Sequence, residues 1–469
     1  MKQLTEGCSL RNSAVCEPKT LDFEIEGRKF SYDCNSMKLF QLEEGESITG
    51  ADRVPQFPFT SWFGVSAMVL EATHACHNAC RYCFVDLKYD DHVHTMKLDT
   101  ALRAITYFFP RPEKGFNPRV KAPHIGFFGG EPLLNWPLID GVTGFLRGYC
   151  HPIRPSLGMT TSAVLMTEER AKYLTDHGYS FIVSLDGPKD IHDAFRPHKD
   201  GDGTYDRAIQ GIKYLNDAGT RNITLRGTFT ADCVRLLDRV VHLNELCDVG
   251  MGNWASVEPA DLSEHACVKA GPGMVFTPET VRALESEYMA CAKWFVERVK
   301  NGKKVRFHQL YKTVERLLYG FASPNECGAG RAYIGIGPTG SIHACHRENN
   351  SYIGHMDKGW IDEALRAKWV DNRGIYTRPK CVACPIRFVC GSGCRESSLG
   401  DSGDITIPNV ISCEFWKLFF KAAVWVVSEV DKATLMTAIP MPQGLCRPKI
   451  GQCKGCVDKG EPVEGSPAP

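Results

Sequence analysis

EATHACHNACRYCFV, residues 71–85, is the stretch that decides the fold we expect for this chain. Its Cys76, Cys80 and Cys83 follow Cys-x3-Cys-x2-Cys spacing within one short loop. Three thiols at this spacing could belong to a disulfide framework, a zinc site or an iron–sulfur site. A zinc site needs a fourth ligand, which His74 or His77 could supply. A four-iron cluster on three thiolates would instead leave one iron open, and an open position is what metal chemistry requires.

The composition of the whole chain favours metal binding or catalysis over disulfides. The chain has 469 residues and 21 cysteines, and it shows neither an apolar export signal nor a run of 18 apolar residues. We therefore expect a cytoplasmic protein without membrane partners, in which clustered cysteines hold metals. The formal net charge is zero, so we expect no nucleic-acid partner either.

Apolar runs alternate with helical patterns from residue 64 to residue 261. This alternation predicts an α/β fold in which parallel strands are covered by helices, as a partial (β/α)6 TIM-like barrel. Active sites of such barrels lie at the C-terminal ends of the strands, which is where the cysteine loop falls. From residue 321, Gly, Pro and Cys increase and the periodicity fades, which indicates a small, loop-rich, metal-stabilised domain. We expect a β-meander and linker over residues 1–62, the barrel over 63–305, the loop-rich domain over 306–430, and a cysteine-containing, partly disordered tail over 431–469.

Polar residues follow four later strands of the expected barrel. They occur in the segments GFFGGEP, TTSAV, SFIVSLDG and LRGTFT. Glycines let a backbone approach a ligand closely, while serine, carboxylate and guanidinium groups supply hydrogen bonds and charge. The candidates are Gly129, Gly130, Glu131, Ser162, Ser184, Asp186 and Arg226.

A second set of cysteines follows the barrel at a spacing that chance does not explain. Its core is CVACPIRFVCGSGC, residues 381–394, and the residues alone allow zinc or iron–sulfur binding. His343 and His346 are alternative ligands. Cys446, Cys453 and Cys456 could donate a further ligand, hold a separate metal or form an exposed redox tail. The second set consists of Cys327, Cys345, Cys381, Cys384, Cys390, Cys394 and Cys413.

Together these motifs resemble the radical S-adenosylmethionine (SAM) superfamily, with a C-terminal SPASM domain. The resemblance rests on the first three cysteines with the aromatic residues Tyr82 and Phe84, on the GGEP and SLDG segments, and on the seven later cysteines; it covers roughly residues 64–415. It implies that SAM chelates the open iron of a [4Fe–4S] cluster. One electron then cleaves a C–S bond of SAM, and the resulting 5′-deoxyadenosyl radical abstracts hydrogen from a substrate.

The resemblance also implies roles for single residues. The GGEP segment would bind the amino group of SAM, and Ser184 and Asp186 would contact its ribose. Ser162 stands where many relatives have asparagine. Arg226 is a candidate partner for the SAM carboxylate through charge-assisted hydrogen bonds. Two auxiliary [4Fe–4S] clusters are implied, one on Cys381, Cys384, Cys390 and Cys413, and one on Cys327, Cys345 and Cys394 that could keep an open iron for a substrate thiolate.

SPASM relatives modify peptides and proteins, so we expect a substrate peptide or small protein and an electron donor such as flavodoxin or ferredoxin. Sulfatase maturases carry Asp directly after the cysteine of the G-x4-C element, where this chain has His346. We therefore expect cysteine thioether cross-links, with Glu258 as candidate base. Alternatives are carbon–carbon cross-linking or oxidation of a peptide, or a zinc-stabilised binding protein without activity. Strands within residues 18–45 could recognise a leader segment by strand addition.

Overall fold

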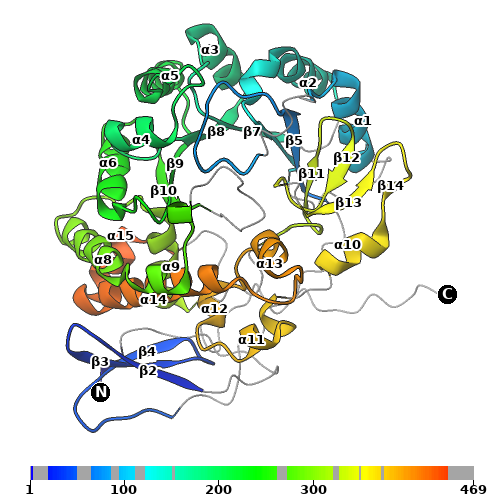
Figure 1. Ribbon diagram of the computed structural model, residues 1–469. Coiled ribbons are helices and arrows are strands. Elements are labelled where there is room, and N and C mark those ends of the chain that lie inside the picture. Colours follow the sequence, from blue (N-terminus) through cyan, green and yellow to red (C-terminus); the bar gives the residue numbers. More distant parts are fainter. Residues whose placement is uncertain are drawn as a thin grey trace, which may run out of the picture.

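The computed structural model describes residues 2–3, 19–49, 65–85, 94–110, 122–149, 154–260, 272–320, 327–347, 350–370 and 374–441. Its centre is a ten-stranded sheet in the order β10-β9-β8-β7-β6-β5-β11-β12-β13-β14. Figure 1 shows this sheet curving around the middle of the molecule with helices outside it. The first six strands are parallel neighbours, as the predicted partial (β/α)6 barrel requires. They are β5 (Ala67–Thr73), β6 (His124–Gly129), β7 (Ser156–Thr161), β8 (Tyr179–Ser184), β9 (Ile223–Phe229) and β10 (Trp254–Pro259).

The strands form where apolar runs can be buried on both faces. Met68, Leu70 and Ala72 of β5 are fully buried, as are Ile125 of β6 and Leu225 of β9. Helices cover the outer face with one apolar stripe each. They are α1 (Leu98–Phe108), η2 (Pro132–Asn135), α2 (Trp136–Gly148), α3 (Glu168–Asp176), α4 (Lys189–Phe195), α5 (Tyr205–Asp217) and α6 (Leu236–Asp248), followed by α7 (Pro278–Arg282), α8 (Glu285–Lys300) and α9 (His308–Tyr319).

In the C-terminal region, four short strands continue the barrel sheet. Strand β11 (Tyr333–Ile336) lies parallel to β5, and β12 (Ser341–His343), β13 (Tyr352–His355) and β14 (Trp360–Ile361) follow it antiparallel. These strands have two to four residues, too few for a period of two to be seen in the sequence. The helices of this domain are α10 (Glu363–Val370), α11 (Pro379–Val382), α12 (Arg387–Cys390), α13 (Arg395–Ser402), α14 (Val410–Glu429) and α15 (Lys432–Ala438).

A separate four-stranded sheet lies at the N-terminal end, in the order β1-β4-β3-β2. It contains β1 (Lys2–Gln3) and the antiparallel meander β2 (Thr20–Ile25), β3 (Arg28–Asp33) and β4 (Lys38–Leu42). Its aromatic residues Phe23 and Tyr32 pack against Phe420 of α14, with ring centroids 5.6 and 5.0 Å apart. In the part of the chain that the structure describes, no helix is both long enough and apolar enough to span a bilayer.

Candidate active site

The cysteine loop leaves β5 at Thr73 and carries three free thiols, Cys76, Cys80 and Cys83, into one cavity. The backbone of neighbouring segments holds the loop: the Ala79 N–H donates to the Pro197 carbonyl at 2.8 Å, and the Arg81 N–H donates to the Phe195 carbonyl at 3.0 Å. The loop therefore sits at the carboxyl edge of the parallel strands, as the sequence predicts.

Most of the predicted SAM contacts lie on the wall of the same cavity. This first cavity is bounded by the carboxyl ends of β6, β7, β8 and β9. Because these strands are parallel neighbours, their ends meet at one edge of the sheet. The predicted residues on its wall are Cys76, Cys80, Cys83, Gly129, Gly130, Glu131, Ser162, Ser184 and Arg226.

Burial changes the acidity of the three thiols. It raises the pKa of Cys76 to about 11 and the pKa of Cys83 to about 12, and it raises the pKa of Cys80 as well. Free thiols here are thus protonated at neutral pH, whereas a coordinating metal deprotonates a thiol outright. Three thiols around a cavity at strand ends fit the donor set of an iron–sulfur cluster. Among the described residues, no group of three or more Cys, His, Asp or Glu side chains is arranged to bind a single metal ion.

The two glycines of GGEP are required by the cysteine loop. A Cβ on Gly129 would lie 2.3 Å from the Thr73 carbonyl oxygen, and one on Gly130 would lie 2.3 Å from that of Ala75. The Gly130 and Glu131 N–H groups donate to these same two carbonyls at 2.8 and 2.9 Å. The sequence predicted close approach to a ligand; the structure shows close approach to the backbone just before Cys76.

Glu131 links β6 to β7. Its side chain is buried, and it accepts hydrogen bonds from the Thr161 hydroxyl at 2.7 Å, the Ser162 N–H at 2.9 Å and the Ser162 hydroxyl at 2.5 Å. This arrangement fixes Ser162 at the cavity wall.

Asp186 lies behind the residues that line the cavity. It is fully buried and is not part of the cavity wall, whereas Ser184 is. The Tyr82 hydroxyl and the Thr228 N–H both donate to its carboxylate, the latter at 3.0 Å. Burial raises the pKa of Asp186, although the nearby Arg196 opposes the shift. Tyr82, which does line the cavity, thus connects Asp186 to it, and the ribose contact of Asp186 stays a prediction.

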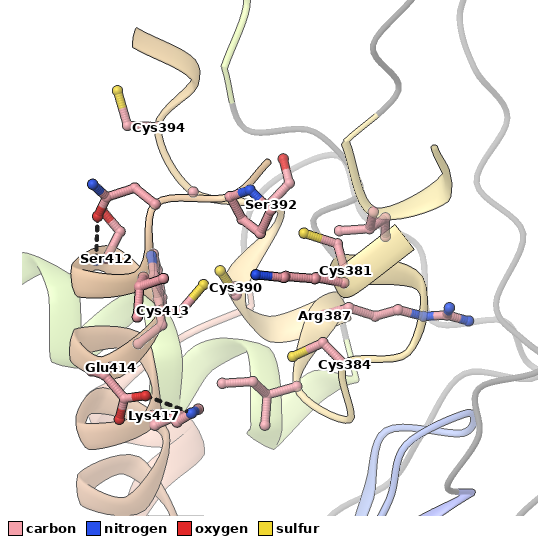
Figure 2. A pocket seen from close by; sticks show the side chains of 18 residues that line it. Cys381, Cys384, Arg387, Cys390, Ser392, Cys394, Ser412, Cys413, Glu414 and Lys417 are labelled. Atoms are coloured by element: carbon pink, nitrogen blue, oxygen red, sulfur yellow. Dashed lines mark hydrogen bonds and ion pairs between the residues drawn. The ribbon is translucent and has the colours of Figure 1, made fainter. Parts of the chain in front are cut away.

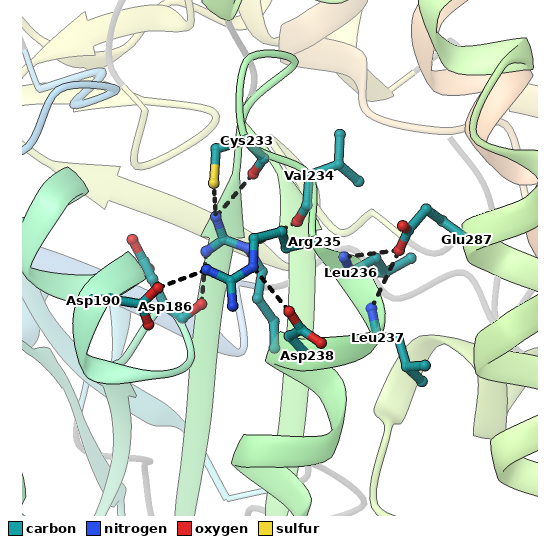
Figure 3. A network of polar contacts seen from close by, with 10 residues as sticks. Asp186, Asp190, Cys233, Val234, Arg235, Leu236, Leu237, Asp238 and Glu287 are labelled. Carbon is teal, nitrogen blue, oxygen red and sulfur yellow. Dashed lines mark hydrogen bonds and ion pairs between the residues drawn. The ribbon is translucent and has the colours of Figure 1, made fainter.

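Arg239 fixes the strand ends around Asp186. It is fully buried and donates to the Asp186 carbonyl at 2.6 Å and to the Thr228 carbonyl at 3.1 Å. Arg239 also donates to the carbonyls of Cys233 and Val234 at 2.9 Å. Figure 3 shows Asp186, Cys233 and Val234 in the surrounding network. Through these bonds, Arg239 connects the ends of β8 and β9 with the segment before α6.

Arg226 and Glu258 form an ion pair with 2.6 Å between Nη2 and Oε2. They come from neighbouring parallel strands, in which Thr228 is opposite Glu258. The Ser256 hydroxyl also donates to Glu258 at 2.9 Å. Burial acts to raise the pKa of Glu258, but the Arg226 charge and these hydrogen bonds hold it below its ordinary value. The predicted SAM-carboxylate partner and the predicted base are therefore bound to each other.

Sequence reasoning missed Arg196, which follows α4 and lines the first cavity. It donates to the Tyr82 hydroxyl at 2.7 Å, and its charge lowers the pKa of Cys80 against the larger effect of burial. The signal available was an arginine at the end of a short helix that follows the SLDG strand end.

A second cavity of about 630 Å³, here called the central chamber, adjoins the first. Pro259, Ala260 and Arg347 line both. Glu258 and Cys394 line the chamber, and its floor is aromatic, with Phe276 and Phe415 packed edge to face at 5.1 Å.

The later cysteines form two groups. The four-thiol set, Cys381, Cys384, Cys390 and Cys413, lines a cavity of about 250 Å³, and Figure 2 shows these sulfurs directed toward its interior. Cys394 is on the wall of the same cavity, but Figure 2 shows its sulfur directed away from the other four. A negative charge on Cys394 would raise the pKa of both Cys327 and Cys345, so the three thiols lie near one another and are here called the three-thiol set. The two groups have the same members as the two sets that the resemblance implies, and their binding of auxiliary clusters stays a prediction.

The alternative ligands His343 and His346 have other contacts. The His343 Nε2 lies 2.9 Å from the Ser341 hydroxyl. His346 bonds the Tyr333 hydroxyl and packs edge to face on Phe128 at 4.7 Å. Burial lowers the pKa of His346 to about 3, so its imidazole is neutral. Cys446, Cys453 and Cys456 lie outside the described residues.

Comparison with known proteins places residues 70–234 in the Radical SAM superfamily, and this part of the chain is a radical SAM domain. The radical SAM cyclopropyl synthase TigE of Paramaledivibacter caminithermalis is 21% identical over 77% of this chain and 74% of its own length. The cysteine-type anaerobic sulfatase-maturating enzyme of Clostridium novyi is 24% identical over 78% of this chain and 97% of its own. The structure of native anSMEcpe with bound AdoMet and Kp18Cys peptide superimposes with a TM-score of 0.63 at 16% identity, covering 78% of this chain and 99% of that one. At this identity the structural likeness establishes the shared fold.

Proposed function

We propose that this chain, which carries a radical SAM domain, is an enzyme that modifies a peptide or protein by radical chemistry. One observation carries the proposal: the thiols of Cys76, Cys80 and Cys83 share a cavity with Glu131 and Ser184 at the carboxyl ends of parallel strands. When bound there, a [4Fe–4S] cluster and SAM supply a 5′-deoxyadenosyl radical that abstracts hydrogen from the substrate.

Within the first cavity, we assign the SAM carboxylate to Arg196 in place of Arg226. The Arg226 guanidinium is in direct contact with Glu258 at 2.6 Å, whereas the Arg196 guanidinium lies beside the Cys80 thiol and donates to the Tyr82 hydroxyl at 2.7 Å. Among the described residues Arg196 forms no direct ion pair, and the Asp186 carboxylate acts on it through Tyr82. A guanidinium with no carboxylate in direct contact keeps N–H groups for charge-assisted hydrogen bonds to a bound carboxylate. Ser184 and the Gly129–Glu131 segment remain our candidates for the ribose and the amino group of SAM.

The central chamber is our candidate site for the substrate. It adjoins the first cavity at Pro259, Ala260 and Arg347, so a bound peptide would lie next to the radical. The aromatic floor around Phe276 and Phe415 suits an apolar side chain. The Glu258 carboxylate lines the same chamber, is 39% exposed and is ionised at neutral pH, so it can accept a proton from the substrate.

We propose that the product is a cysteine thioether. Cys394 lines the chamber and belongs to the three-thiol set, so an auxiliary cluster held by that set would lie beside the chamber and could supply an iron site for a substrate thiolate. Forming the C–S bond removes two hydrogen atoms from the peptide. The 5′-deoxyadenosyl radical would take the one on carbon, the thiol would lose its proton to a base such as Glu258, and the remaining electron would pass to the auxiliary cluster. Oxidation of the sulfatase-maturase type is less favoured, because His346 is neutral and packed between Tyr333 and Phe128. The second candidate, carbon–carbon bond formation, is favoured by the similarity to a cyclopropyl synthase.

The proposed chemistry requires an electron donor and a peptide substrate as partners. An electron donor such as flavodoxin or ferredoxin would reduce the clusters, and a cytoplasmic, reducing setting suits the free thiols. Strand β2 is an edge of the N-terminal sheet, so it could pair with a leader segment of the substrate.

The decisive experiment begins with anaerobic reconstitution and measures iron, sulfide and zinc per chain. Three four-iron clusters require about 12 iron atoms. SAM cleavage is then followed as 5′-deoxyadenosine, and a cysteine-bearing peptide is examined by mass spectrometry for the loss of two hydrogen atoms. Zinc with little iron, and no SAM cleavage, would contradict the proposal.

A further inference from the structure

Arg378 is a fully buried cation in the domain that carries the two later thiol sets. Its Nη1 donates to the Ser392 carbonyl at 2.7 Å, and its Nη2 donates to the Ile405 carbonyl at 2.6 Å. Its own carbonyl accepts from the Cys381 N–H at 2.9 Å. Arg378 is thus fixed rigidly to the backbone on which the thiols are mounted.

Arg378 lies near both thiol sets. Ser392, which it holds, stands between Cys390 and Cys394 in the chain and lines the cavity of the four-thiol set. Its charge interacts with Cys381 and Cys413 of that set, and also with Cys394 of the three-thiol set.

Carbonyl hydrogen bonds do not neutralise a buried guanidinium. Among the described residues no carboxylate lies within ion-pair distance of Arg378, and the exposed Asp404 acts on it only at longer range. Burying an uncompensated charge is costly, so such a cation calls for a fixed negative charge nearby. Protonated thiols do not provide that charge, whereas thiolates of an iron–sulfur cluster do.

We propose that Arg378 is a shared counter-cation of both auxiliary clusters and raises the reduction potential of each. This inference rests on the proposed function, because it needs clusters on both thiol sets. A cluster becomes more negative when it is reduced, and a fixed cation nearby stabilises the more negative state. Arg378 is therefore a potential-setting residue and not a ligand.

A neighbouring arginine supplies the matched control. The Arg316 Nη1 donates to the Val389 carbonyl, and its charge interacts with Cys390 of the four-thiol set. Replacing Arg316 should therefore affect one cluster, and replacing Arg378 should affect two.

The test is an EPR-monitored redox titration of the full-length, anaerobically reconstituted protein. Cys76, Cys80 and Cys83 are replaced by Ala in every sample, so that only the auxiliary clusters give signals. Arg378→Met should lower both midpoint potentials, with a change of at least tenfold in the reduction equilibrium, or about 59 mV for one electron. Arg316→Met should lower one potential, and Arg378→Lys should leave both near the parent values.

Each outcome decides the inference. Unchanged potentials in an Arg378→Met protein with full iron content would overturn it, and so would a shift of one potential only. If Arg378→Met fails to load iron, Arg378→Gln, which keeps a donor for the Ser392 carbonyl but no charge, is titrated instead; failure of both neutral variants would make Arg378 a structural residue. A parent protein without iron on the later cysteines would instead show that the cluster assignment of the proposed function is wrong.

Discussion

The cysteine loop after β5 and the later cysteines, from Cys327 to Cys413, both gather thiols and both use backbone hydrogen bonds, but in the later region buried guanidinium groups also bond the backbone. In the loop, backbone N–H groups bond backbone carbonyls, as Glu131 does with Ala75 at 2.9 Å and Ala79 with Pro197 at 2.8 Å. In the later region, buried guanidinium groups bond the backbone, as Arg378 does with Ser392 and Arg395 with the Trp369 carbonyl at 2.9 Å.

This difference indicates what each region needs in order to keep its shape. The loop takes its position from parallel strands whose hydrogen bonds need no metal. The later region has strands of two to four residues and several buried cations, so the negative charge of bound clusters would complete it. The barrel should therefore tolerate loss of its iron better than the later region does.

Removing the thiols of the loop has the largest expected effect. We expect the combined Cys76→Ala, Cys80→Ala and Cys83→Ala protein to lose SAM cleavage completely, because no thiolate remains to hold the first cluster. Iron should fall from about 12 to about 8 atoms per chain, since the later thiols are untouched. Metal analysis and chromatography of 5′-deoxyadenosine measure both effects.

Cys233→Ala serves as the control, because Cys233 is a half-buried thiol near the same barrel edge and belongs neither to the cysteine loop nor to the two later thiol sets. It should keep both iron and SAM cleavage. Loss of all iron from the triple variant would mean that the two regions depend on each other, and the contrast drawn above would fail.

Glu258→Gln has the next largest expected effect. Glu258 belongs to the barrel and lines the central chamber together with Cys394 of the later region. Product formation should fall by about 10²–10⁴-fold if Glu258 accepts a proton, while 5′-deoxyadenosine formation continues. Because Arg226 lowers the pKa of Glu258, the wild type should lose no product formation through this group until the pH falls below about 4.3, the ordinary value for glutamate. Ser256→Ala, which removes one hydrogen bond to the same carboxylate, should have the smaller effect. Equal loss of both readouts would instead show that Glu258 acts on the SAM site through Arg226.

Local motifs in the sequence were enough to predict the barrel, the cysteine loop and the strand ends that surround it. The Arg226–Glu258 pair could not be predicted, because it depends on the register between β9 and β10. The hydrogen bond from Tyr82 to Asp186 joins residues that are 104 positions apart in the chain. Arg378 stands in an exposed-looking RPK segment, and only the fold shows that it is buried between thiols.

Gly130→Ala tests whether backbone contact supports the loop. The new Cβ would meet the Ala75 carbonyl oxygen at 2.3 Å, so the loop must shift, at an expected cost of about 1–3 kcal/mol. The melting temperature and the iron content of the first site should both fall. Gly144→Ala is the matched control: it lies on α2 with nothing within 4 Å of its Cβ and should stabilise the helix by about 1 kcal/mol. An unaffected Gly130→Ala protein would mean that the backbone contact does not position the thiols.

The smallest expected effect concerns the outer seam between the two regions. Tyr107 at the end of α1 stacks on Trp360 of β14, with ring centroids 3.8 Å apart and planes within 4°. Such a pair contributes about 1 kcal/mol, so Tyr107→Ala should speed amide hydrogen exchange in β13 and β14 by about fivefold. Leu134→Ala, at a side chain that is 45% exposed on η2, should leave that exchange unchanged. If the pairing of β11 with β5 is the main connection, exchange in β11 stays slow in the Tyr107→Ala protein, because four residues of each strand remain in register. Faster exchange throughout β11 to β14 would show that this surface contact, and not the continuous sheet, holds the later region on the barrel.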